Sequence, residues 1–496
     1  MNESGPKGMI VLIAAVLGSI AALFIGFGLQ PVVLWTDALI YLLLAVVSGF
    51  VFDARRRPHL SAPWRQVGRR RIGVITIIVL AVYVVTGLLD SIHFHPPLKD
   101  TGHQTQREYS PQVLSFLDVA LNHLREDVEK TYSAPFATHL FVKEAVRRPD
   151  GQVVREYPRL RYGGAQLADL SHKGRDIALT SLKAVVEAFA AFALVCLVTV
   201  GWLARRQGIE YRAMARRVAR GETDVPWRAA LLTVAAVTAL ISLGANLSMH
   251  YHVLGTDKVG QDVLYLAIKS IRTGLVIGTL TTLVMLPFAI ALGVVAGYFG
   301  RWADDAIQYL YTTLSSIPGV LLIAAAILIM QAYIDGHPDQ FNSISSRADA
   351  RLLFLCIILG ITSWTNLCRL LRGESLKLRE MDYVQASSVL GANHLRIIAR
   401  HIVPNVMHIV LIVVVIDFSG LVLAEAVLSY VGVGVDPSMI SWGNMINSAR
   451  LELARDPVVW WSLLAAFVFM FTLVLAANLF SDVVRDAFDP RVGGSS

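Results

Sequence analysis

About ten runs of apolar residues, each close to twenty residues long, limit what this chain can fold into. A helix of that length crosses the hydrocarbon core of a bilayer. The composition agrees, because 55% of the 496 residues are hydrophobic and only 16% are charged. We therefore predict an all-α polytopic membrane protein. The expected spans are 9–29, 32–52, 72–89, 185–203, 229–247, 274–297, 310–330, 352–367, 406–423 and 459–479, and the first is expected to be retained rather than cleaved as a signal peptide.

Two arginine clusters set the expected orientation. Seven arginines lie between residues 55 and 71, and six lie between residues 205 and 220. Cytoplasmic loops of membrane proteins carry an excess of Arg and Lys, so both clusters are expected in the cytoplasm. Counting spans from them places both termini inside and residues 90–176 outside. The net charge of +7 is attributed to topology and lipid headgroups, and no nucleic-acid partner is expected.

The polar segment 382–405 lies between two apolar runs and has a distinctive pattern. It predicts a short helix of small residues, a break at Gly391, a second amphipathic helix and a stop at Pro404, because glycine permits positive φ and proline lacks an N–H. Small side chains permit close approach of a partner, and a plain interfacial helix is the alternative. The expected contact residues are Gln385, Ala386, Ser387, Gly391, Arg396, Ile402 and Pro404.

This segment resembles the EAA loop of ABC-importer permeases, with Gln385 and Ser387 in place of the usual glutamate and second alanine. Other segments, in order along the chain, resemble the C-type subunit of the dipeptide and oligopeptide permease family. They are Leu-Gly-Thr-Asp at 254–257 with Gly-Gln-Asp-Val at 260–263, Leu-Ala-Glu-Ala at 423–426, Ser-Trp-Gly at 441–443 and Asp-Pro-Arg at 489–491. The resemblance implies that the 382–405 loop is a coupling helix that docks into an ATPase.

The resemblance also implies an architecture and partners. A six-helix type I importer core is expected at 229–496, preceded by membrane spans in 1–89, a small extracytoplasmic α+β insertion at 90–176 and a span with a basic linker at 177–228, which gives four extra N-terminal spans. The implied partners are a homologous B-type permease, two ATPase subunits holding ATP and Mg²⁺, an extracytoplasmic solute-binding protein and lipid of the bacterial inner membrane. The chain has no G-x-x-x-x-G-K-[ST] loop, so we expect neither a cofactor nor enzyme activity in it.

Four acidic residues are candidates for the transport pathway or its gate: Asp417, Glu425, Asp257 and Asp262. Ionisable groups in a bilayer usually face the bundle interior or water, although pairing with another helix is an equal alternative for Asp417 and Glu425. Asp37, in the second apolar run, is expected to form a structural pair.

The outside segment is expected to contain one amphipathic helix at 111–133 and two strands that flank a turn at Pro149, Asp150 and Gly151. His93 and His95 within it are weak candidates for a nickel or zinc site, and a plain loop is the favoured interpretation.

The expected function is a permease subunit of an ATP-driven importer of peptides or similar small solutes. Nickel or another non-peptide cargo is the alternative within the family. An ion-coupled secondary transporter that uses Asp37, Asp417 or Glu425 as proton relays is a rival class, but no inverted repeat is found in the sequence. A membrane receptor that binds a ligand at 90–176 is a second rival. The 382–405 pattern argues against both.

Overall fold

The computed structural model describes residues 29–56, 58–97, 109–147, 153–339, 341 and 343–488. Within these residues, eight helices are long and apolar enough to span a membrane, which confirms the all-α polytopic class. They are α4 (Arg71–Asp90), α7 (Lys173–Gln207), α9 (Trp227–Ser248), α10 (Val263–Phe299), α12 (Gly319–Gly336), α13 (Ile344–Arg379), α16 (Val403–Val431) and α18 (Trp461–Phe488). A shorter apolar stretch lies in α2 (Trp35–Arg56), and the expected span 9–29 lies outside the described residues.

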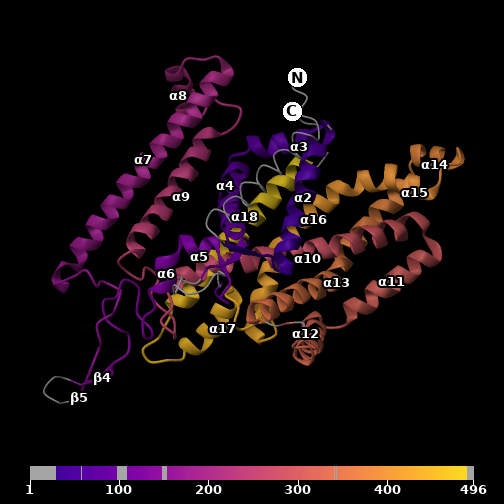
Figure 1. Cartoon of the computed structure of the whole chain (residues 1–496). Helices are drawn as coiled ribbons and strands as arrows, with labels where there is room; N and C mark the ends of the chain where they lie inside the picture. The colour runs from indigo at the N-terminus through magenta and orange to yellow at the C-terminus, as the bar shows by residue number, and fades with distance from the viewer. Residues whose placement is uncertain are drawn as a thin grey trace, which may run out of the picture.

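The centre of the membrane unit is the pair α10 and α13, which pack together along much of their length (Figure 1). Glycines on α10 allow this close approach. A Cβ added to Gly293 would lie 2.8 Å from the carbonyl oxygen of Cys368, and one added to Gly297 would lie 2.6 Å from that of Arg372. Small residues at helix contacts are typical of membrane proteins, because they let the backbones meet. Helices α16 and α18 pack against the same centre.

A different helix from the predicted one completes this core. Helix α9 was expected to be the first core span, but it packs mainly against α7, and α8 (Tyr211–Arg220) lies at the end where the two helices are joined (Figure 1). Helix α4 instead lies against both α10 and α18. The hydroxyl of Tyr83 in α4 donates to the backbone oxygen of Phe469 in α18 at 2.9 Å. A helix that precedes residue 229 therefore packs directly against the core helices.

The single span expected at 310–330 is two helices. Helix α11 (Arg301–Ser316) ends before Ile317, whose ψ of 131° is extended, and α12 begins after Pro318. Proline disfavours the helical conformation of the residue before it, which explains the break. Asp304 in α11 pairs with Arg372 of α13 at 2.7 Å and fixes the first turn of α11 to the core.

The segment between α4 and α7 contains both short helices and strands, but its helices differ from the single predicted one. One antiparallel sheet joins β1 (Gln30–Val32), β2 (His93–His95) and β3 (Leu114–Ser115), and a separate pair joins β4 (Glu144–Arg147) and β5 (Val153–Glu156). The predicted turn at 149–151 lies outside the described residues. Instead of one helix at 111–133, the chain forms α5 (Phe116–Ala120) and α6 (Asn122–Glu126).

Local hydrogen bonds explain why that helix is short. Ser115 and Asp118 form a capping box that fixes the start of α5, so no helix can begin at residue 111. After α6 the backbone turns away, and the N–H of Glu129 donates to the carbonyl oxygen of Gly260 at 2.9 Å. Contacts with the segment before α10 therefore prevent the apolar residues at 111–133 from forming one continuous helix.

The outer third of α10 carries a row of polar side chains that bind the N-terminal half of the chain. The row consists of Asp262, which precedes the helix, and Tyr265, Lys269 and Arg272, and its spacing places it along one helical face. The Nζ atom of Lys269 lies 2.7 Å from Asp90 of α4 and 2.5 Å from Asp118 of α5. The insertion is thus joined to α10 by charged groups as well as by packing.

Arg272 lies at the deepest point of this row and is buried. Its Nη2 atom is 2.6 Å from Asp37 Oδ1 of α2, 3.0 Å from Thr36 Oγ1 and 3.9 Å from Asp349 Oδ1 of α13. Asp37 also lies 2.8 Å from Nδ1 of His93. The structural pairing expected for Asp37 is therefore present, and it joins α2 and β2 to the two central helices.

A second buried group joins the insertion to the start of α10. Nδ1 of His252 is 2.7 Å from Asp262 Oδ2, and its Nε2 is 3.5 Å from Glu129 Oε1. Burial alone would lower the pKa of His252, but the two carboxylates raise it to about 9.

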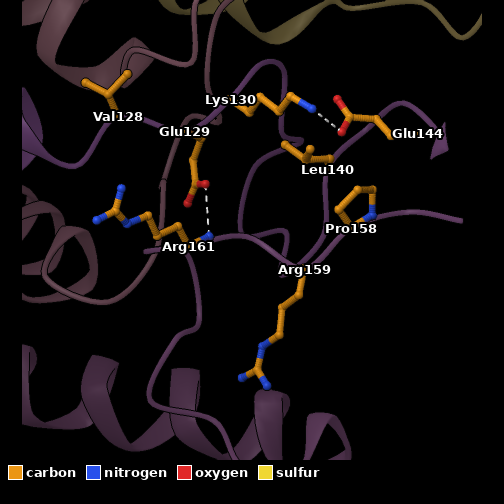
Figure 2. A pocket seen from close by; sticks show the side chains of 8 residues that line it. All are labelled: Val128, Glu129, Lys130, Leu140, Glu144, Pro158, Arg159 and Arg161. Atoms are coloured by element: carbon orange, nitrogen blue, oxygen red, sulfur yellow. Dashed lines mark hydrogen bonds and ion pairs between the residues drawn. The ribbon is translucent and has the colours of Figure 1, made fainter. Parts of the chain in front are cut away.

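Glu129 also accepts backbone N–H groups from residues 161–163, at 2.8 to 3.1 Å. Burial alone would raise its pKa, but His252 and these donors lower it to about 2. Figure 2 shows Glu129 beside Arg161 in a hollow of the insertion.

We expect His252→Gln to lower the free energy of unfolding by about 2 kcal/mol near neutral pH. Because the folded-state pKa is raised, the contribution of His252 is fully present below its ordinary pKa of 6.5 and is lost as pH rises through about 9. Thermal unfolding measured from pH 6.5 to 9.5 should therefore show a shallower slope for the variant. The exposed neighbour His250→Gln is the control, and equal slopes for all three proteins would contradict this assignment.

Candidate functional site

The 382–405 segment forms the predicted two-helix loop. Helix α14 (Asp382–Val389) and helix α15 (His394–Ile397) are separated by Gly391, whose φ is 81°. Glycine reaches this left-handed conformation without the steric cost that a Cβ imposes. The loop lies at the same end of the membrane helices as α3 (Pro58–Arg69) and α8 (Figure 1). Both arginine-rich segments are at this end.

The tip of the loop is apolar and exposed. Val389 and Leu390 are 87% and 86% exposed, and Leu395 across the glycine is 72% exposed. Adjacent exposed apolar side chains of this size mark a surface that contacts another molecule. Sequence reasoning missed these three residues, although the pair Val389 and Leu390 in an otherwise polar segment was the available signal.

The predicted contact residues divide between the surface and the core. Gln385, Ala386, Gly391, Arg396 and Pro404 are exposed, and Ser387 is half-buried. Ile402 is fully buried, so it anchors the loop and does not present itself to a partner.

Buried side chains fix the base of the loop. Ile397, Ile402 and Val384 pack into the cluster formed by the inner ends of α10 and α13. The ring of His394 meets the hydroxyl of Tyr298 in α10, with 2.9 Å between Nδ1 and the oxygen. The loop is therefore rigidly connected to the central helices.

Pro404 does not stop the second helix, contrary to the prediction. One continuous helical stretch runs from His394 to Val431, and Pro404 lies in the first turn of α16. Residues Ile398–Ile402 form a π-helical turn, in which the N–H of Val403 donates to the carbonyl oxygen of Ile398. This wider turn lies immediately before Pro404, whose ring nitrogen carries no N–H to donate to the preceding turn.

Glu425 lies at the outer end of α16 and is buried. Its Oε1 accepts the hydroxyl of Ser429 at 2.8 Å, and Ser441 and the backbone of Gly443 also bond the carboxylate. A Cβ on Gly443 would lie 2.5 Å from that oxygen, which explains the glycine. Glu425 therefore joins α16 to α17 (Trp442–Glu452).

Asp257 and Asp262 shape the start of α10. Asp262 is the N-cap, with its Oδ1 accepting the N–H of Leu264 at 2.8 Å, and it also pairs with His252. Asp257 closes the preceding turn, because its Oδ1 accepts the N–H groups of Val259 and Gln261, each at 2.9 Å. Both carboxylates thus hold local structure.

Asp417 is half-buried in the middle of α16, and no hydrogen bond or ion pair joins it to the described residues. Of the four pathway candidates, it is the one whose carboxylate does not hold neighbouring backbone or side chains in place.

The metal candidates occupy one strand: His93 pairs with Asp37, and His95 lies 3.3 Å from the carbonyl oxygen of Gln112. Among the described residues no group of three potential metal ligands forms.

Comparison with known proteins agrees with a chain of membrane-spanning apolar helices and places it among membrane transport components. Residues 289–494 match the family "Binding-protein-dependent transport system inner membrane component". The oligopeptide transport system permease protein OppC of Mycobacterium tuberculosis is 31% identical over 239 residues, which cover 48% of this chain and 76% of that protein. The chain belongs to this family.

Other relatives match to a similar extent. The glutathione transport system permease protein GsiD of Pectobacterium atrosepticum is 30% identical over 243 residues, 49% of this chain and 73% of that protein. OppC of Bacillus subtilis is 30% identical over 241 residues, 49% of this chain and 72% of that protein. The family match begins within α10, so helices α2 to α9 precede it.

Proposed function

We propose that this chain is a permease subunit of an ATP-driven ABC importer that moves peptides or similar small solutes across the bacterial inner membrane. Family membership supports the class of protein. The relatives are named as oligopeptide, dipeptide and glutathione transport permeases, which supports peptides as the cargo.

The partners follow from this proposal. A homologous B-type permease completes the passage, two ATPase subunits bind ATP and Mg²⁺, and an extracytoplasmic solute-binding protein delivers the cargo. This chain supplies half of the passage and the surface that receives the ATPase, with both termini in the cytoplasm.

The α14–α15 loop is the observation that carries the proposal. An element that couples an ATPase to membrane helices must protrude, present a contact surface and connect rigidly to the spans. The exposed side chains of Val389, Leu390 and Leu395 supply the surface. The Tyr298 contact with His394 and the continuous helix into α16 supply two separate connections to the membrane core.

Gly391→Val is expected to reduce ATP-driven uptake about tenfold in proteoliposomes, without changing the yield of inserted protein. No atom lies within 4 Å of an added Cβ at this position, so the effect comes from forcing a β-branched residue to a φ of 81°. The change would redirect the loop and separate Leu390 from Leu395.

Gly244→Val in α9 is the matched control, because an added Cβ there also meets nothing within 4 Å while its φ is ordinary. Its uptake should remain near that of the unmodified protein. Normal uptake by Gly391→Val at a normal yield would remove the coupling role from this loop.

A further inference from the structure

We propose that a cavity between α17, the outer end of α16 and the extracytoplasmic insertion binds a short peptide by its two charged ends. This inference rests on the proposed transport function and assigns a particular site to it. The site lies outside the coupling loop and includes none of the four acidic residues singled out from the sequence.

The cavity has a volume of about 370 Å³. One wall is the polar face of α17, where Asn444, Asn447 and Ser448 follow one another at helical spacing. Residues after the end of α16 and Tyr132 of the insertion form other parts of the lining. This volume lies within the range of small-molecule sites, which is about 300 to 1,000 Å³.

Three exposed cationic side chains line the cavity. The guanidinium group of Arg450 stacks over Tyr430 at 5.3 Å from the ring centroid, and that of Arg455 stacks over Tyr132 at 5.1 Å. Lys258 is the third cation. Within the described residues none of the three lies at ion-pair distance from an acidic side chain, and Lys258 and Arg455 act on Glu452 only electrostatically. Stacking orients a guanidinium group while leaving its in-plane N–H donors free, which is the geometry that binds a carboxylate.

A buried carboxylate, that of Glu452, lines the same cavity. Glu452 is 3% exposed, and its Oε1 accepts the hydroxyl of Tyr132 at 3.3 Å. Its Oε2 is buried and accepts no hydrogen bond from the described residues. Burial raises the pKa of Glu452, and an ammonium group brought by a ligand would offset that cost.

Because the cavity carries both cations and a carboxylate, it favours a ligand with one charge of each sign. A purely anionic ligand would meet the carboxylate of Glu452, and a purely cationic ligand would meet the three cations. A short peptide carries a free amino group for Glu452 and a free carboxylate for Arg450 and Arg455. The cavity also contains Ser429, whose hydroxyl donates to Glu425, so a bound peptide would touch the junction of α16 and α17.

Binding of dialanine, N-acetyl-dialanine and dialanine amide to the full-length chain in nanodiscs tests this site. Saturation-transfer NMR is a suitable measurement, because it detects weak binding. Dialanine should bind about tenfold more tightly than either blocked analogue, since each analogue loses one charged contact. Equal affinity for the three compounds would overturn the proposal.

Two variants assign the ends of the peptide. Glu452→Gln keeps an acceptor for Tyr132 and should lose about tenfold in affinity for dialanine, with little change for N-acetyl-dialanine. Arg450→Gln should weaken dialanine but not dialanine amide. The exposed Lys143→Gln lies outside the cavity and is the control. Equal losses for all three compounds in both variants would also refute the site, provided that thermal unfolding shows intact folds.

The binding measurement tests the cavity separately from the transport function. Binding with the expected pattern but no ATP-driven peptide uptake by the assembled complex would refute the proposed function and retain the site. Uptake without selective binding would retain the function and remove the site.

Discussion

Arg272→Met is expected to lower the free energy of unfolding by about 3 to 5 kcal/mol. Arg272 is buried and donates to Asp37 at 2.6 Å and to Thr36 at 3.0 Å. Methionine would fill much of the same space but would leave the carboxylate of Asp37 buried without its guanidinium partner. Thermal unfolding followed by size-exclusion chromatography in detergent measures the loss.

The double variant Arg272→Met with Asp37→Asn should regain most of the lost stability, because it removes both charges. Arg351→Met is the matched control: Arg351 pairs with Asp436 at 3.3 Å at a partly exposed site, so its loss should cost at most about 1 kcal/mol. If Arg272→Met and Arg351→Met lose the same stability, the buried group does not hold α2 to the core.

Deleting residues 101–174 with a flexible closure is expected to abolish most of the folded protein. The sequence predicts a small insertion at 90–176, and the structure shows that its charged residues complete buried groups on the core. The deletion would remove Asp118 from Lys269 and Glu129 from His252. Lys269 would keep only Asp90 and His252 only Asp262, so each of these cations would lose one of its two carboxylate partners. The yield of monodisperse protein in detergent tests this expectation.

Replacing residues 144–156 alone by a Gly-Ser linker is the control. This change removes β4 and β5, which pair with each other, while the buried carboxylates stay in place. Its yield should be close to that of the unmodified protein. A full deletion that folded equally well would show that the charged row on α10 does not require the insertion.

Local signals in the sequence predicted the two-helix form of the 382–405 segment well. The small residues before Gly391 and the amphipathic stretch after it define α14 and α15, because both effects act over a few neighbouring residues. Pro404 was assigned wrongly, since the π turn that accommodates it depends on helix packing that hydropathy does not report. The break at Pro318 had a local signal, but the apolar run across it was given more weight.

Long-range packing was less predictable. Helices α4 and α9 are both apolar, so hydropathy alone could not decide which one joins the core. Tyr83, which reaches α18, distinguishes α4 only after its partner is known. The same reason explains why Glu452 was missed: its importance comes from Tyr132, which is 320 residues away in the sequence. Asp257 and Asp262 were found by their motif, but their hydrogen bonds depend on the folded turn.

The continuous helix through Pro404 mechanically connects the α14–α15 loop to the opposite end of the membrane helices. Its 38 residues from His394 to Val431 span about 57 Å at the ordinary rise of an α-helix. One arm begins at the exposed loop, and the other ends at Gly432 in the lining of the peptide cavity. Under the proposed function, a tilt imposed by an ATPase at the α14–α15 loop moves that cavity wall directly, with the π turn as the pivot. In that scheme, motion driven by the ATPase changes the contacts of a peptide bound at the far end of the helix.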